Sequence, residues 1–157
     1  MLTKINDKSI MNYITLIKTI LDTAINEKGI KTVGEGDIFE INNKPDVEYP
    51  IFWASATEPQ VEHENYFEYV LTFYYVDRLS SNANRIKDTE VAGVHSAGIQ
   101  IISNIIKKLR QDPRLIDVDS EVRYTLWNDT TVFADVCNGV YTTVHIKAPK
   151  ETNCIEY

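Results

Sequence analysis

The chain has few of the residues from which cross-links, metal sites and membrane spans are built. Cysteine occurs only at Cys137 and Cys154, and histidine occurs three times in 157 residues. Two thiols without a secretory signal indicate a reducing compartment during folding and argue against a disulfide framework. The longest uncharged run, residues 91–106, is too short and too polar to span a bilayer. We therefore expect neither disulfide bonds nor contact with a membrane.

Positive charge is also scarce, because 16 Lys and Arg stand against 23 Asp and Glu, for a formal net charge of −7. Binding of nucleic acid across a broad surface depends on Lys and Arg side chains that neutralise phosphates. The negative net charge therefore argues against such binding. It remains compatible with a protein that surrounds DNA without binding it. An acidic wall repels phosphate and would let DNA slide past.

Length and composition indicate one globular domain. A chain of this length buries about 70% of the surface that it exposes when unfolded. Its 43% hydrophobic and 25% charged residues are an ordinary globular mixture. We predict a single domain over residues 1–157, with a core at about 10–148 and a C-terminal tail at 149–157.

No motif for catalysis or for cofactor binding is present. The Gly34-Glu35-Gly36 segment lacks the third glycine and the Lys-Ser/Thr pair of phosphate-binding loops, so it indicates a turn. Cys137 has no neighbouring base in the sequence. The three histidines have none of the close spacings by which two imidazoles reach one metal: His63, His95 and His145. We therefore predict no catalytic, cofactor-binding or metal-binding residues, no cofactor and no enzymatic activity.

Two amphipathic helices are predicted. The first spans residues 9–28, with Asp7 or Ser9 as its cap and Gly29 at its end. Its apolar residues recur at three- and four-residue spacing: Ile10, Tyr13, Ile14, Ile17, Leu21, Ala24 and Ile25. The second spans residues 88–110, begins acidic, ends basic and stops at 111–113. Its stripe is Val91, His95, Gly98, Ile101, Ile102, Ile105 and Leu109.

Strands are predicted between and after the helices. Two short ones, 30–33 and 37–41, flank the glycine turn, and another begins near Val47, with Pro50 favouring an edge or strand-start position. Residues 65–76 form a long strand. Three more, 122–127, 131–137 and 140–148, are joined by tight turns at 128–129 and 138–139. We predict an α+β fold, a mainly antiparallel sheet with both helices packed on one face.

The long strand carries an ambiguous second face. One face is apolar throughout, whereas the other alternates apolar and polar side chains: Tyr66, Glu68, Val70, Thr72, Tyr74 and Val76. A neighbouring subunit that covers part of this face would explain the mixture. Burial under a helix of the same chain would explain it equally well.

A cationic loop follows the long strand. Arg78, Arg85 and Lys87 lie within ten residues of each other in an acidic chain, with almost no apolar anchor between them. One interpretation is a solvated loop with local ion pairs worth under about 1 kcal/mol. The other is an arm that meets an acidic surface on the next subunit.

The order of these segments resembles the tail-terminator and neck-ring proteins of tailed bacteriophages. Within this class, the chain is most similar to the proteins of phages that infect Bacteroidetes, including the crAss-like group. Three phrases carry the resemblance, within a match over about residues 13–147: Glu48-Tyr49-Pro50, the long strand ending Tyr-Tyr-Val-Asp-Arg-Leu at 74–79, and Ile-Gln-Ile-Ile at 99–102. Residues 146–157 have no counterpart in that pattern.

The resemblance implies a virion structural protein that assembles in the host cytoplasm and forms a six-fold or twelve-fold homo-oligomeric ring in the tail or neck. Such a ring joins a portal, an adaptor or other tail components around the DNA channel, without specific DNA binding. It implies inter-subunit contacts at Tyr74, Asp77, Arg78, Arg85 and Lys87. The alternative is a non-enzymatic bacterial or phage adaptor or assembly chaperone that forms no ring.

Overall fold

The computed structural model describes residues 11–43, 46–79, 90–129 and 137–150, and these form an α+β fold, as predicted. Their sheet has seven strands and is mostly antiparallel. In chain order the elements are α1 (Tyr13–Ile25), β1 (Thr32–Glu35), the 3-10 helix η2 (Ile38–Asn43), β2 (Ile51–Ser55), β3 (Val61–Glu62), β4 (Tyr66–Arg78), α2 (Glu90–Arg110), β5 (Asp117–Val118), β6 (Thr125–Asp129) and β7 (Cys137–Pro149).

The long strands β4 and β7 form the centre of the sheet. The strand order is β1-β2-β4-β7-β5, with β3 also paired to β4 and β6 also paired to β7. The β4–β7 pairing runs without interruption from Tyr66 opposite Pro149 to Arg78 opposite Cys137. All pairings are antiparallel except β1 with β2, which is parallel.

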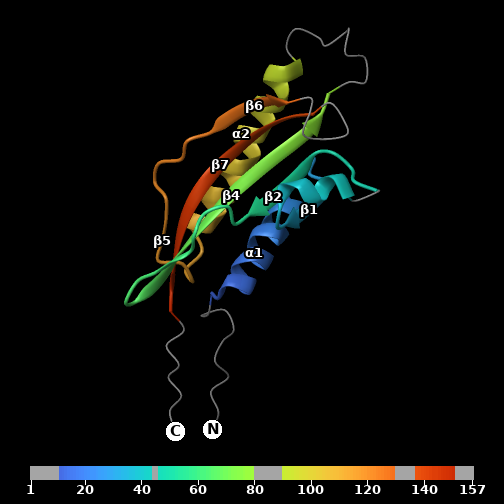
Figure 1. The fold of residues 1–157 in the computed structure, drawn as a ribbon. Coiled ribbons are helices and arrows are strands. Elements are labelled where there is room, and N and C mark those ends of the chain that lie inside the picture. The colour runs from blue at the N-terminus through green and yellow to red at the C-terminus, as the bar shows by residue number, and fades with distance from the viewer. Residues whose placement is uncertain (1–10, 44–45, 80–89, 130–136, 151–157) are drawn as a thin grey trace.

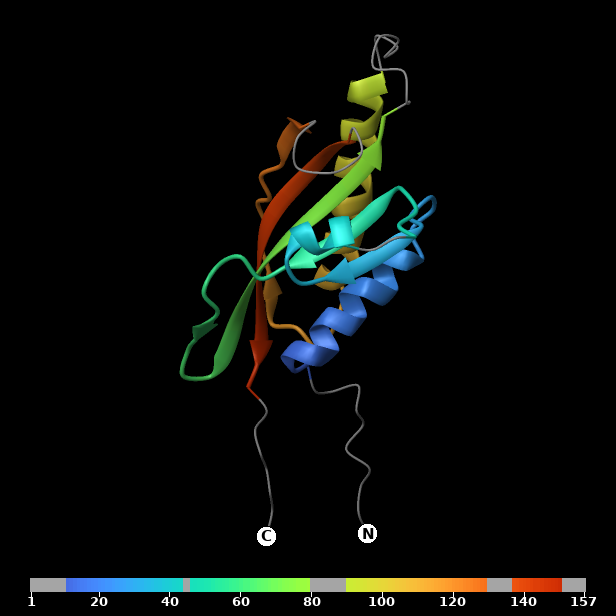
Figure 2. The same ribbon diagram turned by 45° about the vertical axis from the view of Figure 1, so that its right-hand side comes forward.

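Both α-helices cover one face of the sheet, and Figures 1 and 2 show them behind and beside it. Alternate residues of β4 point to the helices because side chains alternate between the two faces of a strand. Leu71 and Phe73 are fully buried there, and the Phe73 ring lies 5.4 Å from that of Phe52 on β2. The main core therefore lies between this face and the two helices.

Helix α1 is shorter than predicted and begins at a different cap. Asn12 is the N-cap, and its Oδ1 accepts a hydrogen bond from the Thr15 N–H at 2.8 Å. An asparagine in this position supplies an acceptor for one of the free N–H groups of the first turn. The predicted caps Asp7 and Ser9 lie outside the described residues. Gly29 has the positive φ expected of it, 97°, but follows the helix end by four residues.

The inward face of α1 is rotated from the predicted one. Leu16, Ile17, Ile20 and Ala24 are buried, whereas Ile14 is 65% exposed and Ile25 is 44% exposed. The prediction assigned Ile14 and Ile25 to the core because the apolar arc of α1 is wider than the contact with the sheet. The excess apolar residues lie on an outer flank of the helix.

Helix α2 is confirmed, and its predicted residues Gly98, Ile102, Ile105 and Leu109 are buried. Asp88 lies outside the described residues, and the helix as described begins at Glu90. His95 is half-buried, with Nε2 at 3.1 Å from the Trp127 carbonyl oxygen. Hydrogen bonding therefore accounts for this histidine in an otherwise apolar stripe.

The close approach of α2 to the sheet predicts opposite effects for two glycine substitutions in one helix. A Cβ on Gly98 would lie 2.7 Å from Val140 Cγ2 and 2.8 Å from Tyr75 Cδ1, whereas one on Gly93 would meet nothing within 4 Å. We expect Gly98→Ala to lower the free energy of unfolding by about 1–3 kcal/mol through overpacking. Gly93→Ala should raise it by up to about 1 kcal/mol through helix propensity. Urea unfolding measures both, and equal effects would contradict the packing described.

The second short strand predicted near the N-terminus is wrong. Residues 38–41 fall in η2 and residue 37 directly precedes it, so none of them is in a strand, because the chain turns at Gly36, whose φ is 107°. The Asp37 carboxylate then accepts a hydrogen bond from the Phe39 N–H at 2.9 Å, which favours a helical turn. The predicted hairpin is therefore absent from this segment, and β1 pairs in parallel with β2 instead. Pro50 precedes the first residue of β2, which agrees with the predicted strand start.

Both tight turns predicted near the C-terminus are wrong. Asn138 and Gly139 lie inside β7, and Asn128 and Asp129 lie inside β6, where the two segments pair with one another. The glycine serves close packing here: a Cβ at Gly139 would overlap the Tyr75 carbonyl and the Trp127 ring. Most of the predicted strand 131–137 lies outside the described residues, and the two-residue β5 was not predicted.

Candidate interaction surface

The sheet face that points away from the helices is the candidate interaction surface, called here the open face. The ambiguous residues of the long strand lie on it, and their neighbours on β7 are the alternate residues Tyr141, Thr143, His145 and Lys147. Because these side chains do not face either α-helix, any cover must come from loops of this chain or from another molecule.

The chain itself covers the β1–β2 end of the open face. Trp53 is 1% exposed and packs in a second core with Ile51 and Val76 beneath Ile41 of η2. The Trp53 indole lies against Gly34 on β1, where a Cβ would overlap it, and its Nε1 donates to the Gly36 carbonyl at 3.0 Å. This end of the face is therefore interior.

The connection from β2 to β3 covers a second part of the open face. Gln60 pairs with the Val70 backbone like a strand neighbour: its Oε1 accepts from the Val70 N–H at 2.8 Å, and its Nε2 donates to the Val70 carbonyl at 3.0 Å. The Thr57 and Thr72 hydroxyls are 2.8 Å apart, and Thr72 is 3.2 Å from the Thr143 hydroxyl. Val70 and Thr72 are buried as a result. Burial by the same chain, here by loops and η2, thus explains much of the mixed pattern.

Tyr74 and Tyr141 mark the part of the open face that stays half-exposed. Their ring centroids are 5.6 Å apart, with the rings tilted at 36°. Partial burial raises the pKa of the Tyr74 hydroxyl above its ordinary value, and Tyr141 and Asp37 add to the rise. Tyr74 is therefore neutral near pH 7. The two tyrosines offer rings with a polar tip, a combination that is common at protein interfaces.

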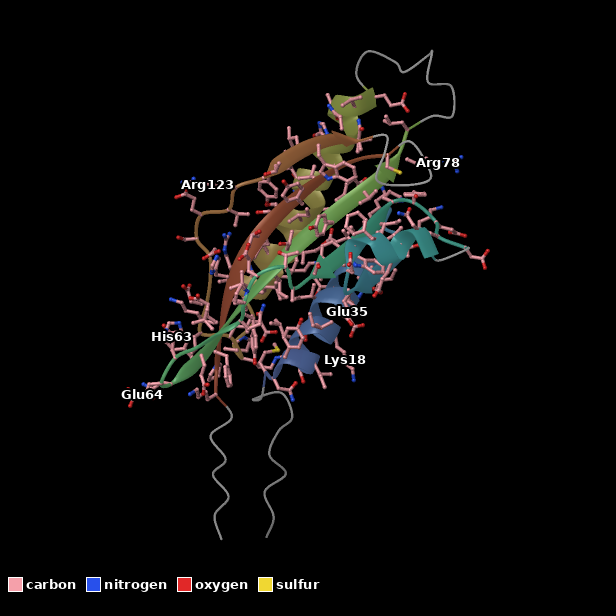
Figure 3. The ribbon with its side chains drawn as sticks, viewed as in Figure 1. Lys18, Glu35, His63, Glu64, Arg78 and Arg123 are labelled. Atoms are coloured by element: carbon pink, nitrogen blue, oxygen red, sulfur yellow. The ribbon has the colours of Figure 1, made fainter. Side chains whose placement is uncertain are left out.

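The other predicted contact residues are separated by the structure. Asp77 faces the helix layer beside Tyr75, and burial raises the pKa of its carboxyl while the Arg78 N–H, at 2.8 Å, opposes the rise. Arg78 is exposed at the end of β4 and points away from the body in Figure 3. Arg85 and Lys87 lie outside the described residues. Tyr74 and Arg78 therefore share a face of β4, and Asp77 does not.

A hollow of about 440 Å3 opens beside β7, where residues 119–124 leave the sheet between β5 and β6. Two hydrogen bonds hold this segment to β7: the His145 N–H donates to Asp119 Oδ2 at 2.8 Å, and the Thr142 hydroxyl donates to the Arg123 carbonyl at 2.7 Å. His145 Nδ1 also lies 3.5 Å from Glu68 Oε2. The hollow is open, and its lining side chains are polar and charged. It is therefore better suited to a protruding surface of another molecule than to a small ligand that would be buried.

Within the described ranges, no group of three or more His, Cys, Asp or Glu side chains is placed to hold a metal ion. Among the same residues, neither α-helix is long and apolar enough to cross a bilayer. His63 stacks on Tyr66 with ring centroids 4.3 Å apart, and Cys137 is a buried cysteine outside any disulfide.

Sequence reasoning missed the exposed apolar side chains that lie outside β4 and β7. Six large ones are exposed in the described part of the chain: Ile14, Ile25, Phe39, Val61, Ile116 and Leu126. For Ile14 and Ile25 a signal was present, because the apolar arc of α1 is wider than one contact face needs. For Leu126 and Ile116 the flanking sequence gives no such signal.

Comparison of the chain with protein-family models gives no match, and comparison with curated proteins gives none either.

Proposed function

We propose that this protein is a structural subunit of a tailed-phage virion, a ring-forming component of the tail or of the head-to-tail connector. In this proposal it has no enzymatic activity and joins neighbouring tail components around the DNA channel. The resemblance in segment order and short phrases supplies the class of protein. The half-exposed aromatic part of the open face, at Tyr74 and Tyr141, is the structural observation that carries the assembly role.

The physical argument begins with the one-sided sheet. A sheet with helices on one face needs cover on the other face where that face is apolar, and among the described residues this cover comes from η2 and the β2–β3 connection. The remaining tyrosine pair and the exposed aliphatic residues elsewhere fit contact with other protein surfaces. An acidic ring with a net charge of −7 per chain would not hold DNA that passes through it.

The purified chain is expected to form closed rings, six-fold or twelve-fold, visible by negative-stain microscopy. Light scattering should give a molar mass of six or twelve times the chain mass of 18.0 kDa. Closed rings follow from head-to-tail interfaces whose rotation closes. A monomer or a dimer at all concentrations would contradict the ring and favour the adaptor or assembly chaperone.

A further inference from the structure

The outer edge of β7, which faces away from β4, has a gap in its pairing. β6 pairs with β7 up to Tyr141, and β5 pairs with β7 from Ile146 onward. Between these pairings the chain bows away from β7, as Figure 1 shows, although Asp119 still binds the His145 backbone. Thr143 lies in the middle of the gap.

The backbone N–H and C=O of Thr143 point into this gap. In an antiparallel strand both groups of one residue point to the same neighbour, and successive residues alternate between the two neighbours. The Lys147 carbonyl uses the outer edge and accepts from the Ile116 N–H at 2.8 Å. The His145 carbonyl does the same with the Asp119 N–H at 3.1 Å. Thr143 continues this alternation, and within the described ranges no residue pairs with its backbone at this edge.

The segment that borders the gap is held away from Thr143. In a continued β6 register Arg123 would lie opposite Thr143, but its carbonyl accepts from the Thr142 hydroxyl at 2.7 Å instead. At the other end Asp119 is fixed, since its Oδ2 accepts a β7 backbone N–H at 2.8 Å and its carbonyl accepts from Arg110 Nε at 3.0 Å. The hollow of about 440 Å3 therefore lies in front of Thr143, which is part of its lining.

A gap of the same kind occurs on the outer edge of β4, where a side-chain amide fills it. Val70 lies between the β2 pairing, which ends at Thr72, and the β3 pairing, which begins at Glu68. Gln60 Oε1 accepts from the Val70 N–H at 2.8 Å, and its Nε2 donates to the Val70 carbonyl at 3.0 Å. A primary carboxamide is suited to this role because it presents a donor and an acceptor side by side. The sheet itself thus shows which group satisfies one open backbone position.

The charges around the hollow favour a neutral ligand. Its lining contains four charged or titratable side chains: Asp119, Glu121, Arg123 and His145. Glu121 Oε1 lies 3.1 Å from Arg123 Nε, and the Asp119 carboxylate already accepts from the His145 N–H. The two carboxylates would repel an anion, and the arginine would repel a cation. A carboxamide carries no charge and can use both backbone groups of Thr143.

We infer that the hollow binds a primary carboxamide, the side chain of an Asn or Gln on another protein chain, which pairs with the N–H and C=O of Thr143. The contact repeats at β7 the pairing of Gln60 with Val70. An added strand fits less well, because the flanking positions Tyr141 and His145 already have partners at this edge and only one position is open. The inference goes beyond the proposed function, since it applies to the chain as a monomer or in a ring.

Three capped peptides test the ligand class: acetyl-Gly-Gln-Gly-N-methylamide and its counterparts with Met or Glu in the central position. The caps contain no primary amide, so only the Gln peptide has one. Each peptide is titrated into the full chain with isotope-labelled threonine methyl groups, whose spectra can be recorded for a monomer and for a ring. Thr125, Thr142 and Thr143 line the hollow and report binding there.

The Gln peptide should shift these three methyl signals and saturate below about 100 mM, because two ordinary hydrogen bonds give a weak complex. The Met and Glu peptides should bind at least tenfold more weakly, on the order of one lost hydrogen bond. Equal binding of either control peptide would overturn the inference, as would a Gln peptide that gives no saturable shift at the hollow.

Two substitutions at one position test the contact atoms. Thr143→Pro removes the backbone N–H, and because this N–H points to the outer edge, no pairing with β4 is lost. Thr143→Ala keeps the N–H and, like the proline variant, lacks the hydroxyl. Thr125 and Thr142 remain as reporters in both variants.

The proline variant should bind the Gln peptide about tenfold more weakly than the alanine variant, which should match the wild type. Equal affinities of the two variants would show that the Thr143 N–H is not the contact. Far-UV circular dichroism checks that the proline variant folds, and if it does not, the comparison of the three peptides on the wild-type chain decides.

Discussion

Replacing Ile105 with alanine is expected to lower the free energy of unfolding by about 2–5 kcal/mol. Ile105 is 0% exposed, as is Ile102 one turn earlier, and both belong to the core between α2 and the sheet. The truncation removes three methyl or methylene groups and leaves a cavity that the fixed strands β4 and β7 cannot fill. Ile102→Ala should behave in the same way.

Urea unfolding at two protein concentrations measures this loss and separates folding from assembly, because only assembly depends on concentration. Lys107→Ala is the control, since Lys107 is exposed on the same helix and should change stability by less than about 0.5 kcal/mol. A loss well below 1 kcal/mol at Ile105 would mean that this stripe faces solvent or a partner.

The helices and the long central strand were predictable because their signals are local and repeat many times. The α2 stripe recurs over five turns, and the β4 alternation continues over 13 residues, so single exceptions such as His95 do not change the result. The α+β class followed from the order of these strong elements. For α1, periodicity predicted the helix but not which of its side chains pack on the sheet. Ile14 and Ile25 were therefore assigned to the buried face, although both are exposed.

The C-terminal turns were not predictable for a different physical reason. An Asn-Gly pair fits a hairpin turn, yet the same pair fits a strand in which a neighbour leaves no room for a side chain. At Gly139 the Tyr75 carbonyl and the Trp127 ring occupy that space, and both residues are distant in the sequence. No window of sequence around Asn138 contains this information.

The candidate interface shows the same limit. The resemblance pointed to Tyr74 as a contact residue, and the β4 alternation placed it on the ambiguous face, where it is half-exposed. Tyr141, the other half-exposed tyrosine of the open face, lies 67 positions later in the chain and becomes its neighbour only once β4 and β7 have paired. Which side chains meet on an exposed sheet face follows from strand order and register, which single-sequence patterns leave undetermined.

Trp53→Ala is expected to lower the free energy of unfolding by about 3–5 kcal/mol. Trp53 is the largest side chain of the second core and fixes three segments: β1 through Gly34, the Gly36 turn through its Nε1 hydrogen bond, and η2 through Ile41. Trp53→Phe keeps a ring but leaves the Gly36 carbonyl without this donor, so a loss of about 1–3 kcal/mol is expected. Chemical denaturation followed by circular dichroism measures both losses.

A double-mutant cycle with Gly34→Ala tests the cause of the Trp53 effect. Gly34 does not have a positive φ, so alanine there meets no backbone penalty and only the overlap with the indole. With Trp53 in place, Gly34→Ala should cost about 1–3 kcal/mol. In the Trp53→Ala background the space is free, and the same substitution should cost less than about 0.5 kcal/mol. Equal costs in both backgrounds would show that the indole does not lie against β1, and the closed end of the open face would then need another explanation.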